Sequence, residues 1–70
     1  MMTLNTAKEM LSKDYNDALG AFASYLLQFD KWDREEELEE LDELIFHTAN
    51  YEWGLGEQWL RIYSGLLCAV

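Results

Sequence analysis

The sequence predicts an all-α protein, in which a helical hairpin and a C-terminal helix form one small three-helix bundle over residues 1–70. No proline occurs among the 70 residues, so no residue of the type that breaks helices from within is present. Apolar residues recur at spacings of three and four, the period of one helix face. A chain this short buries only about 60% of the surface that its unfolded form exposes, so a monomer would be marginally stable. Dimerisation therefore also remains open.

The first helix is expected to begin at Thr6, because Thr6-Ala-Lys-Glu9 fits a capping box for the free backbone N–H groups. Its apolar stripe has the regular spacing of a coiled-coil seam. The polar stretch 12–17 interrupts this pattern, so one long helix and two shorter helices both remain open. The stripe consists of Ala7, Leu11, Tyr15, Ala18, Phe22, Tyr25, Leu26 and Phe29.

The second helix should follow a short connection at residues 29–32. Asp33 is a favourable N-cap, with Glu36 three positions further on. The helix is expected to extend to about Asn50. Its predicted buried stripe is Leu38, Leu41, Ile45 and either Thr48 or Ala49.

The last helix is separated from the second by Gly54-Leu-Gly56, because two glycines so close together disfavour a helix interior. It is expected to run from about Glu57 to Cys68. The side chains predicted to be buried are Trp59, Ile62, Tyr63, Leu66 and Leu67.

Negative charge is concentrated in residues 30–43, which hold nine carboxylates and two basic side chains, a local charge of −7 out of −9 for the chain. The helix dipole favours acids only in the first turn. Beyond it, like charges four residues apart each cost roughly 0.2–0.5 kcal/mol. Two interpretations follow: a solvated face, or a surface kept acidic to recognise a basic partner.

The second interpretation predicts a protein-binding surface in which carboxylates steer the encounter and tryptophans anchor the contact. The partner is expected to present a basic surface, and if that surface normally holds nucleic acid, the acids would compete with phosphates for it. Direct binding of DNA or RNA is not expected, because the chain has no basic patch. The predicted contact residues are Trp32, Asp33, Glu36, Glu39, Glu40, Glu43 and Trp53.

Catalysis is not predicted, because the chain has no glycine-rich phosphate loop and no Ser/His/Asp set. It holds one His and one Cys, so neither a metal nor another cofactor is expected. The first residues lack the pattern of a signal peptide. The longest uncharged stretch, residues 18–29, is shorter than the ~20 residues of a membrane span, so a cytoplasmic protein without membrane contact is expected.

A chain of this size and charge, with Asp30–Glu43 on a predicted helix, resembles the small acidic proteins by which phages and mobile elements block host machinery. These include anti-CRISPR proteins, anti-restriction proteins and inhibitors of host regulators. The resemblance rests on length, net charge and helical pattern. It implies a non-enzymatic inhibitor that binds a host protein in the host cytoplasm, often at a nucleic-acid site.

Two other functions remain open. The chain could be a structural or regulatory homodimeric adaptor in which the apolar stripe of residues 7–29 pairs with the same stripe of a second copy. The acids would then only provide solubility. It could also be an antitoxin or immunity-type protein that neutralises a basic toxin through the same acidic surface.

Overall fold

The computed structural model describes residues 2–69, and all the regular secondary structure assigned to them is helical. The all-α prediction is confirmed, but the small bundle has four α-helices in this range because the first expected helix is divided in two. The elements are α1 (Leu4–Leu11), α2 (Tyr15–Leu26), α3 (Lys31–Thr48), the π-helical turn η1 (Ala49–Trp53) and α4 (Gly56–Ala69).

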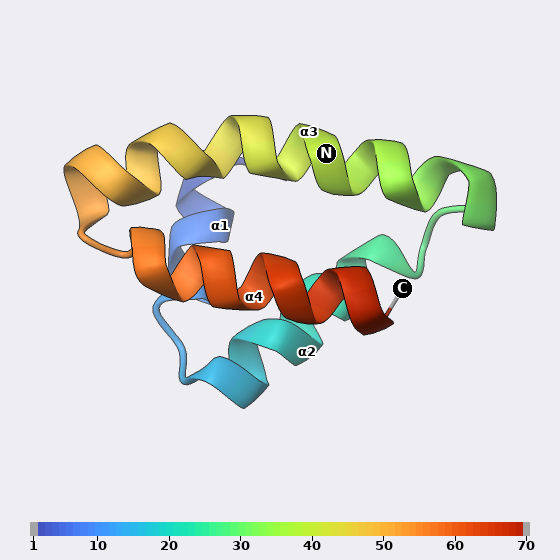
Figure 1. Cartoon of the computed structure of the whole chain (residues 1–70), viewed down its shortest axis with the longest axis horizontal. Coiled ribbons are helices and arrows are strands. Elements are labelled where there is room, and N and C mark those ends of the chain that lie inside the picture. Colours follow the sequence, from blue (N-terminus) through green and yellow to red (C-terminus); the bar gives the residue numbers. More distant parts are fainter. Residues whose placement is uncertain (1, 70) are drawn as a thin grey trace.

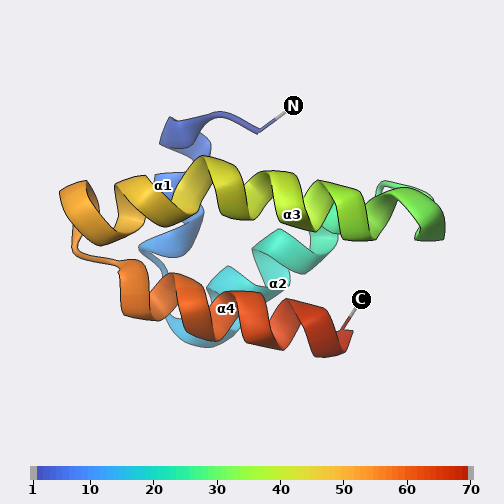
Figure 2. The same ribbon diagram turned by 45° about the horizontal axis from the view of Figure 1, so that its top comes forward.

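The two C-terminal helices run side by side in opposite directions, joined by a tight turn after η1 (Figures 1 and 2). Helix α4 also packs against α2, and α1 packs against α2 and α3. Helix α3 therefore forms a long outer edge of the bundle, with one face on the other helices and the opposite face outside (Figure 1).

The core is formed by apolar side chains from every helix, centred on an edge-to-face contact between Phe22 and Trp59 whose ring centroids are 5.3 Å apart. Gly65 allows α2 to approach α4 closely, because a Cβ there would lie 2.9 Å from Leu19 Cδ1. The fully buried side chains include five members of the predicted stripe of residues 7–29: Ala7, Leu11, Ala18, Phe22 and Leu26. This stripe therefore builds the core of the single chain and does not form an exposed seam.

Helix α1 begins earlier than predicted, because Thr3 and not Thr6 is its N-cap. The Thr3 hydroxyl accepts a hydrogen bond from the Thr6 backbone N–H at 3.3 Å. The earlier start places Met2 and Ala7 at the two positions of a hydrophobic staple, and both are buried.

The break between α1 and α2 falls in the polar stretch 12–17, so the alternative of two shorter helices is correct. Ser12 ends α1, and its hydroxyl donates to the Lys8 carbonyl at 2.7 Å. The carboxylate of Asp14 then caps α2 by accepting from the Asp17 backbone N–H at 3.0 Å.

Helix α3 also begins earlier than predicted: Asp30 is its N-cap residue, and Asp33 lies inside the first turn. The Asp30 carbonyl accepts from the backbone N–H groups of Asp33 and Arg34 at 2.9 and 3.0 Å. Arg34 Nε donates to the Phe29 carbonyl at 3.0 Å. This bond fixes the path of the chain into α3. It favours a helix start at Asp30 over the predicted start at Asp33.

Helix α3 ends at Thr48, near the predicted end at about Asn50, and the chain continues directly as η1 to Trp53. Gly54 then adopts a left-handed conformation with φ of 68°, which glycine reaches without steric cost. The prediction of a break at the two glycines is thus confirmed, with Gly56 as the first residue of α4. Leu67, expected to be buried, is 56% exposed.

Candidate protein-binding surface

The predicted contact residues of α3 lie on its outer face, opposite the buried stripe of Leu38, Leu41 and Ile45. At about 100° per residue, Glu36, Glu39 and Glu43 lie within about 40° of Trp32 on the helix wheel, and Glu40 lies about 80° from it. We call Glu36, Glu39, Glu40 and Glu43 the acidic ridge; all four side chains are exposed.

Trp32 stands at the N-terminal end of this ridge and is 90% exposed. A tryptophan so free of contacts within its own chain contributes almost no hydrophobic stabilisation to the fold. Asp33 is exposed beside it in the first turn, where the helix dipole favours a carboxylate. The structure therefore brings together six of the seven predicted contact residues on one helix.

Trp53 is the exception, because it lies in η1, at the other end of α3 from Trp32. It is half-buried and packs against the core. The Nζ atom of Lys8 lies 5.9 Å from the centroid of its ring. Trp53 therefore contacts Lys8 of α1 and the core, and it is separated from the acidic ridge.

Two aromatic side chains near the C-terminal end of the ridge are not among the predicted contact residues. Tyr51 is 76% exposed and Phe46 is 41% exposed. The His47 ring packs on Tyr51 with 4.7 Å between centroids. The wheel could have identified Phe46, since it lies about 40° from Trp32 in direction. The ridge is therefore bordered by exposed rings at both ends, about 21 Å apart along the axis from residue 32 to residue 46.

Asp42 belongs to the same acidic run but has a structural role. Its Oδ1 accepts a hydrogen bond of 2.8 Å from Nε1 of Trp59, a side chain that is completely buried. A buried indole N–H needs such an acceptor. One carboxylate of the run is thus explained by the fold, while the ridge carboxylates make no such bond among the described residues.

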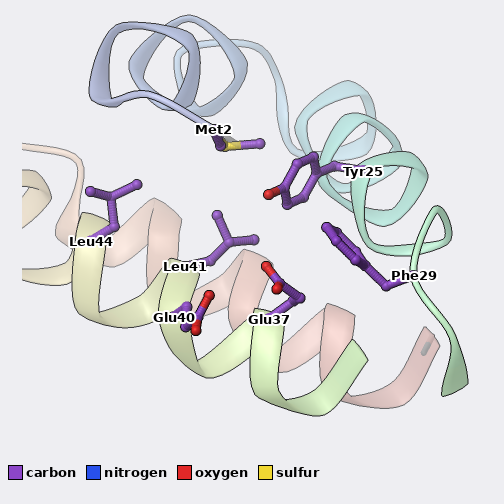
Figure 3. Close-up of a pocket in the computed structure, with 7 residues that line it drawn as sticks. All are labelled: Met2, Tyr25, Phe29, Glu37, Glu40, Leu41 and Leu44. Carbon is purple, nitrogen blue, oxygen red and sulfur yellow. The ribbon is translucent and has the colours of Figure 1, made fainter. Parts of the chain in front are cut away.

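A cavity of about 360 Å³ lies beside the ridge, between α3, α2 and the start of the chain (Figure 3). Glu40 belongs to both the cavity lining and the ridge. The sequence alone does not predict this cavity, because its walls come from three segments: the start of the chain, the end of α2 with Phe29, and α3. Its lining consists of Met2, Tyr25, Phe29, Glu37, Glu40, Leu41 and Leu44.

Glu37 is the half-buried carboxylate of this cavity. It points into the space between Leu41 and the rings of Tyr25 and Phe29 (Figure 3). Partial burial raises the pKa of Glu37 above its ordinary value, and the neighbouring carboxylates, with Glu40 foremost, raise it further. Negative charge is therefore disfavoured at this position, as it is when like charges gather in an incompletely solvated site.

Comparison with protein-family models, with curated proteins and with solved structures gives no match. Among residues 2–69, no helix combines the length and the apolar character that crossing a membrane requires. The same residues contain no group of three or more His, Cys, Asp or Glu side chains placed to hold a metal ion.

Proposed function

We propose that the chain is a non-enzymatic inhibitor or modulator that binds a host protein through the outer face of α3. The protein is of the type that phages and mobile elements encode against host defence or regulation, and it acts in the host cytoplasm. Its partner presents a basic surface of the kind that holds nucleic acid. The acidic ridge then takes the place of phosphates.

The observation that carries this proposal is the coincidence of Trp32 with the acidic ridge on a face that the fold does not use. Tryptophan is enriched among residues that dominate binding energy, and Trp32 is 90% exposed. The ridge costs stability, because Glu36–Glu40 and Glu39–Glu43 are like-charge pairs four residues apart, each unfavourable by roughly 0.2–0.5 kcal/mol.

Electrostatic steering explains how such a surface would act. Clustered carboxylates raise the rate of encounter with a basic surface, and this effect weakens as salt screens the charges. The exposed ring of Trp32 would then supply apolar contact area once the ridge has docked. Binding should accordingly be fast and salt-sensitive, with its lifetime set by the tryptophan.

The test is affinity capture of nucleic-acid-binding proteins from a bacterial lysate on the immobilised chain. The unaltered chain should retain a discrete protein at stoichiometric yield. The variant in which Glu36, Glu39, Glu40 and Glu43 are all replaced by Lys should lose it while circular dichroism stays helical. Equal retention by both chains would remove the ridge from the mechanism.

A homodimeric adaptor is the second candidate, and a specific observation favours it. Leu60 and Leu67 on α4 are 49% and 56% exposed, and a seven-residue spacing places them on one face of the helix. Pairing through this face would replace the predicted pairing through Phe22, which is buried in the core. Sedimentation equilibrium tests the idea: a dimer of this kind must dissociate when Leu60 and Leu67 are both changed to Asp.

A further inference from the structure

The cavity between α2 and α3 has an apolar wall and an acidic wall. Met2, Leu41 and Leu44 provide aliphatic surface, while Glu37 and Glu40 provide two carboxylates. A volume of about 360 Å³ lies within the range of sites that hold small molecules or single side chains. The occupant that fits this lining has an aliphatic stem and a positively charged head.

Aromatic rings complete the lining. Tyr25 and Phe29 form an edge-to-face pair with centroids 5.4 Å apart and an angle of 72° between their planes. Both rings lie across the cavity from Glu37 (Figure 3). A planar cation placed between the rings and the carboxylate meets an electron-rich ring face on one side and a negative charge on the other.

We propose that this cavity receives an arginine side chain of the partner protein. A guanidinium stacks on aromatic faces and donates two parallel hydrogen bonds to carboxylates, which an ammonium group cannot do in the same way. Its methylene stem is apolar and suits the aliphatic wall. A cation at Glu37 also relieves the crowding of negative charge that raises the pKa of this carboxyl.

The position of the cavity connects it with the acidic ridge, and in this respect the inference rests on the proposed function. Glu40 is exposed on the outer face of α3 and also lines the cavity. An arginine of a partner docked along the ridge could therefore enter the cavity beside Glu40, which belongs to both surfaces. The ridge attracts the partner, and the cavity selects one side chain.

The experiment uses a small probe, Nα-acetyl-arginine N-methylamide, titrated into the full chain and followed by NMR of methyl and aromatic groups. The control probe is the citrulline derivative, which has almost the same shape and no charge. Saturable shifts are expected at Met2, Tyr25, Phe29, Leu41 and Leu44 with the arginine probe only. Equal binding of the citrulline probe, no saturable shift, or shifts distributed along the exposed acids would overturn the proposal.

Two matched variants test whether the arginine probe binds at Glu37. Glu37→Gln should weaken binding of the arginine probe about tenfold, as the loss of a charge-assisted hydrogen bond does. Glu35→Gln removes the same charge two residues away, outside both the cavity lining and the acidic ridge, and should change the affinity less than about twofold. Equal effects of the two variants would contradict the assignment. If Glu37→Gln alters the amide spectrum globally, Glu40→Gln replaces it in the comparison.

Different experimental results would contradict the arginine site and the proposed function. If the probe binds as described but the lysine variants of the ridge leave capture of the partner unchanged, the cavity stands and the ridge mechanism falls. If the ridge variants abolish capture while the arginine probe gives no saturable shift, the ridge stands and the cavity is not an arginine site.

Discussion

The indole Nε1 of Trp59 donates a 2.8 Å hydrogen bond to Oδ1 of Asp42, and this bond ties the centre of α4 to the acidic helix α3. Trp59 is completely buried and packs edge-to-face on Phe22. A single carboxylate of the acidic run thus satisfies the one polar atom of the largest core side chain.

Replacing Asp42 with Ala should destabilise the fold by about 1–3 kcal/mol, because it leaves the buried indole N–H without an acceptor. Asp42→Asn keeps an oxygen at this position and should cost less. Urea denaturation measures both. Glu43→Ala, which removes the neighbouring exposed carboxylate, is the control and should stay within about 0.5 kcal/mol of the parent chain. A similar stability for Asp42→Ala and Glu43→Ala would refute the structural role of the bond.

Gly54→Ala should destabilise the fold because of the backbone conformation at this position, and not because of a steric clash. A Cβ at this position would meet no atom within 4 Å, yet φ is 68°, a conformation that costs an L-residue roughly 1–2 kcal/mol. Gly20 has equally free space but lies inside α2, so Gly20→Ala should stabilise by about 0.5–1 kcal/mol. Thermal unfolding of the two variants should therefore shift in opposite directions, and a shift in the same direction would be inconsistent with the turn.

Glu37→Gln should stabilise the fold at pH 7. The pKa of Glu37 is higher in the folded chain than its ordinary value of 4.5, so the folded state binds the proton more tightly than the unfolded state. The charged form then reduces stability above the folded pKa, and this loss disappears as the pH falls through the folded pKa to below 4.5.

The advantage of Glu37→Gln over the parent chain should therefore be largest at neutral pH and vanish in acid. Melting temperatures recorded from pH 7 to pH 4 check this. Glu9→Gln on α1, which removes one exposed carboxylate outside the cavity lining, serves as the control for net charge. An advantage of Glu37→Gln that grows as the pH falls would have the wrong sign for a raised pKa.

Trp32→Ala should separate binding from stability. The ring is 90% exposed, so its removal should change the free energy of unfolding by less than about 0.5 kcal/mol. The loss of an interface tryptophan typically costs binding about 2 kcal/mol or more, equivalent to a decrease in affinity of about 30-fold. Chemical denaturation and calorimetry together measure the two effects. Loss of stability without loss of affinity would assign Trp32 to the fold.

Periodicity predicted the helical class and most of the core, because side chains such as Phe22 and Ile45 are buried on the face that the pattern selects. The predicted starts of α1 and α3 lie three residues too late, because more than one capping residue is available at each. Thr3 caps one turn before Thr6, and Asp30 precedes Asp33. Local sequence does not decide between neighbouring caps; the packing of Met2 and the Arg34–Phe29 bond do.

The outer face of α3 was predictable for the same reason that the core was: a helix that buries Leu38 and Ile45 must expose Glu39 and Glu43. The cavity was not predictable, because its walls come from segments whose proximity only the tertiary fold establishes. The Asp42–Trp59 hydrogen bond could not be predicted either, because its partners are 17 residues apart on different helices.

The most direct test of the acidic ridge is the affinity of the captured partner for two charge-matched variants, measured by calorimetry. One variant replaces Glu36, Glu39, Glu40 and Glu43 with Lys. The other replaces Glu9, Asp17, Glu52 and Glu57 with Lys. Each change brings the net charge from −9 to −1, but only the first alters the outer face of α3. The proposal predicts loss of binding in the first variant and near-parental affinity in the second. An equal loss in both, or none in either, would contradict it.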